Sequence, residues 1–191
     1  MKKMMLLVLT MFAVSTMNGQ IADQIKQSRD RAAKLQVLIK DHKTCGDAQI
    51  DAFGNDLKNA AVLAITNSEL LENLYKREIG QSADGVQDVT VKKPTLKDWE
   101  ELAESVANEG LSIKNAVDKA KGAAEGAKNL AQSAASEKNP MKIAKLAKKS
   151  KAATAVIEFG NAATPILMEE SVAQVKAVAE IIKNLKAGNN L

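Results

Sequence analysis

Residues 151–171 read KAATAVIEFGNAATPILMEES, and within them the segment 152–168 carries a single charged side chain, Glu158. Five polar residues and the one proline of this stretch recur at spacings of three and four. These spacings place them on one narrow stripe of a helix: Lys151, Thr154, Glu158, Asn161, Pro165 and Glu169. The rest of the circumference is apolar, which is typical of a helix contacted by more than one neighbour. We therefore predict a buried central helix.

The same stretch has one alternative interpretation, a segment that enters a lipid bilayer. A membrane span needs about 20 predominantly apolar residues, and a central Glu158 or Asn161 is costly in hydrocarbon. Small residues in the two long helices predicted below would nevertheless suit a hairpin that inserts conditionally. We expect the buried helix and keep the membrane-inserting hairpin as the alternative.

Residues 1–19 read MKKMMLLVLTMFAVSTMNG and have the layout of a secretory signal peptide. Two lysines precede an apolar run from Met4 to Val14, which is too short to span a membrane. We predict cleavage after Gly19, or else after Ser15, and export to the periplasm or the extracellular space. Residues 20–191 then form a single domain. The alternative is an N-terminal membrane anchor.

Composition argues against nucleic acid as a partner. The 191 residues include 27 basic and 23 acidic side chains, and removal of the segment 1–19 takes away two of the lysines. The exported chain is then nearly balanced in charge, and aromatic residues make up 3% of the sequence. General nucleic-acid binders usually carry a larger positive surplus and aromatic side chains for stacking. We expect no nucleic-acid partner.

Helical spacing of apolar residues and clear end signals predict four helices, at about 21–41, 47–79, 95–138 and 140–187, with a loop at 80–94. Asp47, Thr95 and Asn139 are predicted N-caps, and Asp98 completes a capping box with Thr95. Pro140 suits a first helical position. The fold class is all-α, an elongated antiparallel helical bundle or coiled coil. Two long helices form a hairpin, and two shorter helices pack along it.

The apolar stripe of the third helix alternates in steps of three and four from Trp99 to Ala134, with Glu109 as its one charged member. The second half of this stripe is almost entirely alanine, so a partner helix can approach closely. The stripe of the second helix contains Asn67, a polar interruption that would set the register between helices. We expect Trp99 in the core.

The segment DHKTCGD contains the only histidine, His42, and the only cysteine, Cys45. With Asp41 and Asp47 they could form a small metal site, but this spacing is a weak signal for one. A Cys–His nucleophilic pair is a second option, although no third group is evident to orient it. We expect His42 to cap or pack at the end of the first helix. The prediction is therefore no enzyme, no metal, no cofactor and no small-molecule substrate.

The most informative surface feature is the segment KNPMKIAKLAKKSK at residues 138–151. Its lysines cover about half of the helix circumference and form the candidate interaction surface: Lys142, Lys145, Lys148, Lys149 and Lys151. Such a basic amphipathic helix suits an acidic partner or an anionic membrane face. The plainer interpretation is a solvated face whose charge is balanced by acids of the third helix such as Glu125 and Glu137.

These features predict an exported, non-enzymatic helical protein that acts as a structural or protein-interaction component of the cell envelope. Its partner would be another envelope protein, a second copy of this chain or an anionic membrane surface. One alternative is a membrane-active, lipid-binding or pore-forming hairpin. In general plan, as a secreted α-helical rod of this size, the chain is similar to minor pilus-tip subunits of type IV secretion systems. That likeness of architecture implies a second alternative, a minor pilus or secretion-system subunit.

Overall fold

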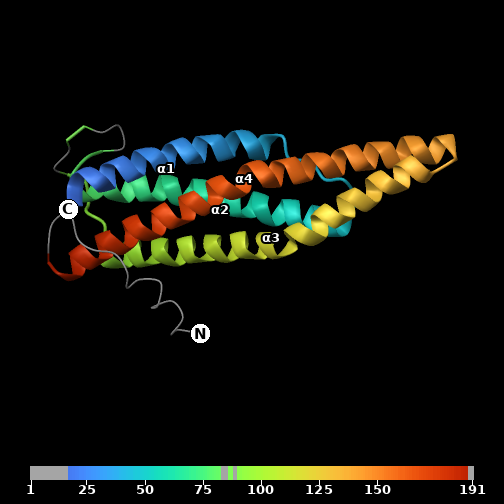
Figure 1. The fold of residues 1–191 in the computed structure, drawn as a ribbon. Helices are drawn as coiled ribbons and strands as arrows, with labels where there is room; N and C mark the ends of the chain where they lie inside the picture. Colours follow the sequence, from blue (N-terminus) through green and yellow to red (C-terminus); the bar gives the residue numbers. More distant parts are fainter. Residues whose placement is uncertain (1–16, 83–85, 88–89, 189–191) are drawn as a thin grey trace.

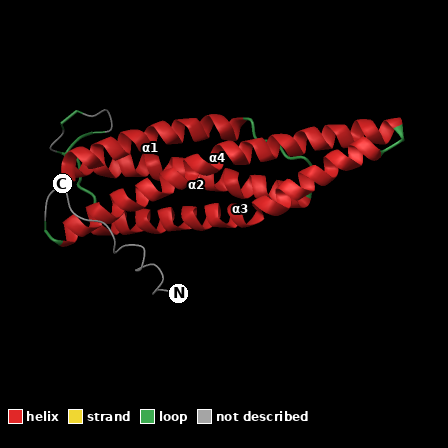
Figure 2. Ribbon diagram, viewed as in Figure 1, coloured by secondary structure: helices red, strands yellow, loops and turns green. Residues whose placement is uncertain are grey.

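The computed structural model describes residues 17–82, 86–87 and 90–188, and for residues 17–20 it describes the backbone only. It contains four helices: α1 (Met17–Lys40), α2 (Ala48–Glu78), α3 (Leu96–Ser136) and α4 (Pro140–Lys186). The described part of the chain has no strand (Figure 2), and one isolated bridge joins Gln81 and Gln87. The predicted all-α class and the number of helices are confirmed. Most of the predicted signal peptide, residues 1–16, lies outside the described residues.

The four helices alternate in direction, and α2 and α4 lie side by side between α1 and α3 (Figure 1). Each of these central helices contacts all three others, whereas α1 and α3 do not contact each other. The helix ends agree with the predicted ones within two residues, except that α1 begins at Met17 instead of residue 21. The bundle is flattened because α1 and α3 are kept apart by the other two helices. Helix α4 lies in the central position that its sparsely charged stretch predicts.

The helix starts follow from capping groups. The Asp47 side chain accepts hydrogen bonds from the backbone N–H groups of Gln49 and Ile50, and Asn139 caps α4 with Pro140 directly after it. Thr95 and Asp98 form a complete capping box. Hydrogen bonds from the Thr95 backbone N–H and hydroxyl hold the pKa of Asp98 below its usual value. Each cap satisfies N–H groups that the first helical turn leaves unpaired.

The stretch at 151–171 folds as its pattern predicts. The stripe residues are all exposed, while the apolar residues on the opposite side are buried: Ala153, Val156, Phe159, Ala163 and Leu167. No helix of the described residues combines the length and the apolar character that a membrane crossing requires. The core-helix interpretation of this stretch is confirmed in the structure described here.

The predicted stripe of α3 faces the core in its first half and becomes shallower toward its end. Trp99 is completely buried, as are Leu102 and Glu109. From Ala127 onward the stripe residues are only partly buried, because α2 begins at Ala48, beside this part of α3: Gly126 of α3 lies next to Ile50. The last turns of α3 and the first turns of α4 extend beyond the other two helices (Figure 1).

Two helical glycines are expected to respond in opposite ways to substitution by alanine. A Cβ on Gly160 would overlap the Phe53 ring and lie 3.2 Å from Leu57 Cδ1, whereas one on Gly110 would meet only Ser171 Oγ at 3.7 Å. We expect Gly160→Ala to lower the free energy of unfolding by about 1–2 kcal/mol, since overpacking outweighs the gain in helix propensity. Gly110→Ala should raise it by up to about 1 kcal/mol. Urea denaturation of both variants measures the difference, and equal effects would contradict the close packing at Gly160.

Candidate functional site

The strongest candidate for an external contact surface is the end of the α3–α4 pair, residues 128–151, which we call the α3–α4 tip. Its two helices are joined by residues 137–139. The Glu137 side chain closes this connection, because its Oε1 accepts hydrogen bonds from the backbone N–H groups of Lys138 at 2.9 Å and Asn139 at 3.0 Å. The turn is thus held by local bonds, and the outer surface of the tip faces solvent.

The five lysines of the predicted surface all lie on the first three turns and a little more of α4. Lys142, Lys145, Lys148 and Lys151 are exposed, and Lys149 is half-buried. Among the described residues, Lys149 alone of these five forms an ion pair, with Asp47 at 3.7 Å. The structure therefore brings four of the predicted residues together as unneutralised surface charges.

Glu125 and Glu137 of the α3 side form no ion pair with the lysines of α4 among the described residues. Glu137 is bonded to the backbone of the turn, and Glu125 makes no ion pair with any described residue. Among the described residues, Lys142, Lys145 and Lys148 thus form no ion pair with Glu125 or Glu137. The reason is positional, since Glu137 occupies the end of α3, where the unpaired backbone N–H groups of the turn are the nearer partners.

A second candidate lies inside the bundle, where polar side chains from all four helices meet. We call it the buried polar layer, and its members are Ser28 and Arg31 of α1, Asn67 and Ser68 of α2, Glu109 and the half-buried Ser105 of α3, and Glu170 and Gln174 of α4. It separates two apolar clusters, one around Trp99 and Ile181 and the other around Leu57 and Leu167. Apart from Ser105, all of its members are buried.

Glu170 is the centre of one half of this layer and is fully buried. Arg31 Nε donates to its Oε2 at 2.5 Å, and Gln174 Nε2 donates to its Oε1 at 2.6 Å. The Ser28 hydroxyl also donates to Oε1, and Gln174 Nε2 reaches the Ala64 carbonyl of α2 at 3.0 Å. The charge of Glu170 is therefore paired and bonded, as a buried charge requires.

Glu109 forms the other half of the layer, and its carboxyl group has no ion-pair partner among the described residues. Its Oε2 accepts a hydrogen bond from Asn67 Nδ2 at 2.9 Å, while its buried Oε1 has no partner among the described residues. Burial raises the pKa of Glu109 to about 7, the hydrogen bond from Asn67 opposes this rise, and the negative charge of Glu170 adds to it. The Asn67 amide is fixed in turn, because its Oδ1 accepts from the Ser105 hydroxyl at 2.6 Å.

Sequence analysis identified only part of this layer. Asn67 and Glu109 stood out as polar members of apolar stripes, but nothing indicated that they bond to each other, or that Arg31, Glu170 and Gln174 meet beside them. The layer could have been predicted by comparing how far each polar residue lies, along its helix, from the connection to the next helix. Glu109 and Glu170 lie at similar distances from the residues 137–139 that join α3 and α4.

The His42 and Cys45 segment does not form the arrangement that a catalytic pair needs. The His42 ring packs on Phe159, with centroids 4.8 Å apart, and both ring nitrogens are buried without a hydrogen-bond partner in the described residues. Burial raises the pKa of Cys45, the backbone of Asp47 opposes this rise, and the Asp51 side chain adds to it. A raised pKa is the opposite of what activates a thiol. No three His, Cys, Asp or Glu side chains of the described residues are grouped so that they could hold a metal ion.

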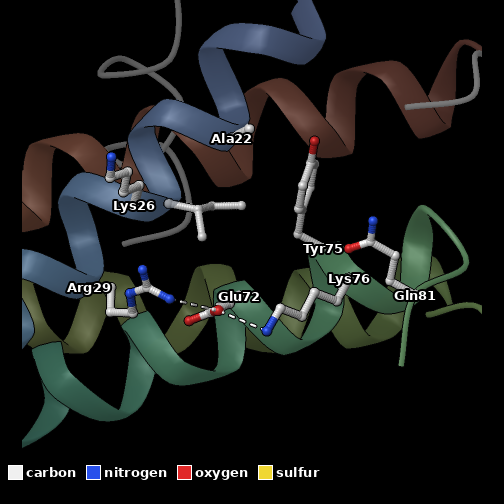
Figure 3. A pocket seen from close by; sticks show the side chains of 8 residues that line it. Ala22, Lys26, Arg29, Glu72, Tyr75, Lys76 and Gln81 are labelled. Carbon is white, nitrogen blue, oxygen red and sulfur yellow. Dashed lines mark ion pairs between the residues drawn. The ribbon is translucent and has the colours of Figure 1, made fainter. Parts of the chain in front are cut away.

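A small open pocket of about 220 Å³ lies between α1 and α2 (Figure 3). Glu72 bridges its rim, since its Oε1 lies 2.9 Å from Lys76 Nζ and 3.6 Å from Arg29 Nη1. Small-molecule sites usually measure about 300–1,000 Å³, so this pocket gives no reason to predict a ligand.

Comparisons with protein-family models, with curated proteins and with solved structures find no match to this chain.

In the unfolded chain Glu109 is exposed and has its ordinary pKa of 4.5, whereas in the folded chain its pKa is about 7. This difference between the two states makes the free energy of unfolding depend on pH. The folded chain binds the extra proton between these values, so its free energy of unfolding falls as pH rises from about 4.5 to 7 and stays low above. The full shift corresponds to roughly 3 kcal/mol. Glu109→Gln should remove this slope and be more stable than the wild type at pH 8.

Urea denaturation at pH 5 and pH 8 measures this effect. Glu104→Gln is the matched control, because Glu104 is an exposed glutamate of the same helix. A slope that persists in Glu109→Gln, or disappears equally in the control, would show that Glu109 is not the responsible group.

Proposed function

We propose that this chain is an exported, non-enzymatic helical protein that acts as a structural or interaction component of the cell envelope. Its contact surface is the α3–α4 tip. The observation that carries the proposal is the projection of this tip beyond α1 and α2, with exposed lysines that no described acidic side chain neutralises. A charge surplus held away from the bundle serves binding and adds nothing to packing.

The arrangement of the long helices is part of the same proposal. In it, α3 and α4 act as an antiparallel coiled-coil hairpin, and α1 and α2 pack along its base. The three–four spacing of the α3 stripe and the small side chains of its second half support such close packing. A minor pilus or secretion-system subunit would be one form of this component, and a second copy of the chain remains a possible partner.

The absence of catalysis in this proposal is supported by the chemistry of the two most reactive side chains. The raised pKa of Cys45 keeps its thiol protonated, and the nitrogens of His42 face packed side chains. The buried polar layer offers charged groups but contributes them to contacts between helices.

The contact surface can be tested with a photo-cross-linking residue in cells that export the chain. Benzoylphenylalanine at position 144 lies on the exposed surface of the α3–α4 tip, and at position 33 it lies on the exposed side of α1. We expect adducts with envelope molecules from position 144 and at least fivefold fewer from position 33. Equal yields from both positions, or none from position 144, would refute the tip as the contact surface.

Export makes a separate prediction about the segment 1–19. N-terminal sequencing of the exported chain should begin at Gln20, and replacing Lys2 and Lys3 by Glu should reduce the processed form, because the positive segment orients a signal peptide. An unprocessed chain that remains with the membrane would instead support the N-terminal anchor.

A further inference from the structure

We infer that the partner of the α3–α4 tip is the headgroup surface of an anionic lipid bilayer. This inference deepens the proposed function and rests on it. The tip would lie on the surface through lysines and one exposed methionine, without crossing the membrane.

The first argument is the distribution of charge. The α3–α4 tip contains seven lysines and a single acidic residue, Glu137. The rest of the chain contains slightly more acidic than basic residues, since the whole sequence has 27 basic and 23 acidic side chains. The positive surplus of the protein is therefore concentrated at one end, as for a polybasic segment that binds phosphate headgroups.

The second argument is the type of residue. The tip has no arginine and no aromatic residue, because the three arginines belong to α1 and α2 and the aromatic side chains of the described residues lie outside it. Protein interfaces are enriched in Tyr, Trp and Arg and depleted in Lys. Lysine carries a mobile point charge on a flexible stem, which suits the diffuse negative charge of a lipid surface better than a shaped protein pocket.

The third argument is an exposed apolar side chain among the lysines. Met141 is 85% exposed, and the spacings of four and three to Lys145 and Lys148 place all three on one side of α4. Lys151 continues this side by one further step of three. On a bilayer, Met141 would enter the boundary between headgroups and acyl chains while the lysines contact phosphates. None of the described helices is long and apolar enough to cross the bilayer.

The test uses residues 20–191, the proposed exported chain, which contain both apolar clusters and lack the apolar run that would itself bind lipid. Binding is measured by sedimentation with mixed vesicles of phosphatidylglycerol in an excess of phosphatidylcholine, and with pure phosphatidylcholine. The tip variant carries Lys→Gln at positions 142, 145, 148 and 151. The control variant carries Lys→Gln at the exposed positions 26, 34, 58 and 183, so the two variants have the same net charge.

We expect the wild type and the control to bind anionic vesicles within about threefold of each other, and neither to bind pure phosphatidylcholine. The tip variant should bind at least one-hundredfold more weakly, since each lysine near an anionic surface contributes a factor of about five. Binding should weaken as salt rises, and it should release no entrapped dye. Circular dichroism confirms that both variants remain helical.

Loss of binding that is equal in the tip and control variants, or no binding to anionic vesicles, would overturn the inference. If vesicles are not bound but position 144 still cross-links to an envelope protein, the partner is an acidic protein and the proposed function stands. If neither occurs, the proposed function fails as well. Dye release would contradict surface docking and favour the membrane-active alternative.

Discussion

The buried contact between Arg31 and Glu170 constrains the rest of the structure. It joins α1 to α4 at 2.5 Å with both side chains removed from water, and Gln174 connects the same carboxylate to the backbone of α2. Sliding a helix by one turn, about 5.4 Å, would break these bonds. It would also leave a buried charge unpaired, which costs about 3–5 kcal/mol. The polar layer therefore favours this register over one shifted by a turn.

That register also determines that the connected ends of α3 and α4 project from the bundle. With Asn67 bonded to Glu109 and Gln174 bonded to Ala64, α3 and α4 are aligned against α2 so that their connected ends extend beyond its first residue. The projecting turns bury few side chains and are free to carry lysines. The unneutralised Glu109 also belongs to this layer, so the register is held most firmly at pH values where that carboxyl is protonated.

Local features of this fold could be predicted from the sequence, because capping and stripe patterns depend on nearby residues. Asp47, Thr95 and Asn139 cap their helices as expected, and the polar stripe of 151–171 is exposed. The contacts of the buried polar layer could not be predicted in the same way. Ser28 and Glu170 are separated by 142 positions, and periodicity does not say which helices become neighbours or at what height they meet. Periodicity also does not show that Glu137 bonds to the backbone N–H groups of the turn instead of to a lysine.

Under the proposed function, stability and binding depend on different parts of the molecule. Close helix contacts occupy the part in which all four helices overlap, where Gly160 lies against Phe53 and polar bonds fix the alignment. Beyond the start of α2, the remaining constraint is the pairing of α3 with α4. Lys142, Lys145 and Lys148 are exposed there and form no ion pair with a described residue, so replacing them removes no buried contact. Such changes should alter binding without altering folding, which makes the α3–α4 tip separable by mutation from the bundle that supports it.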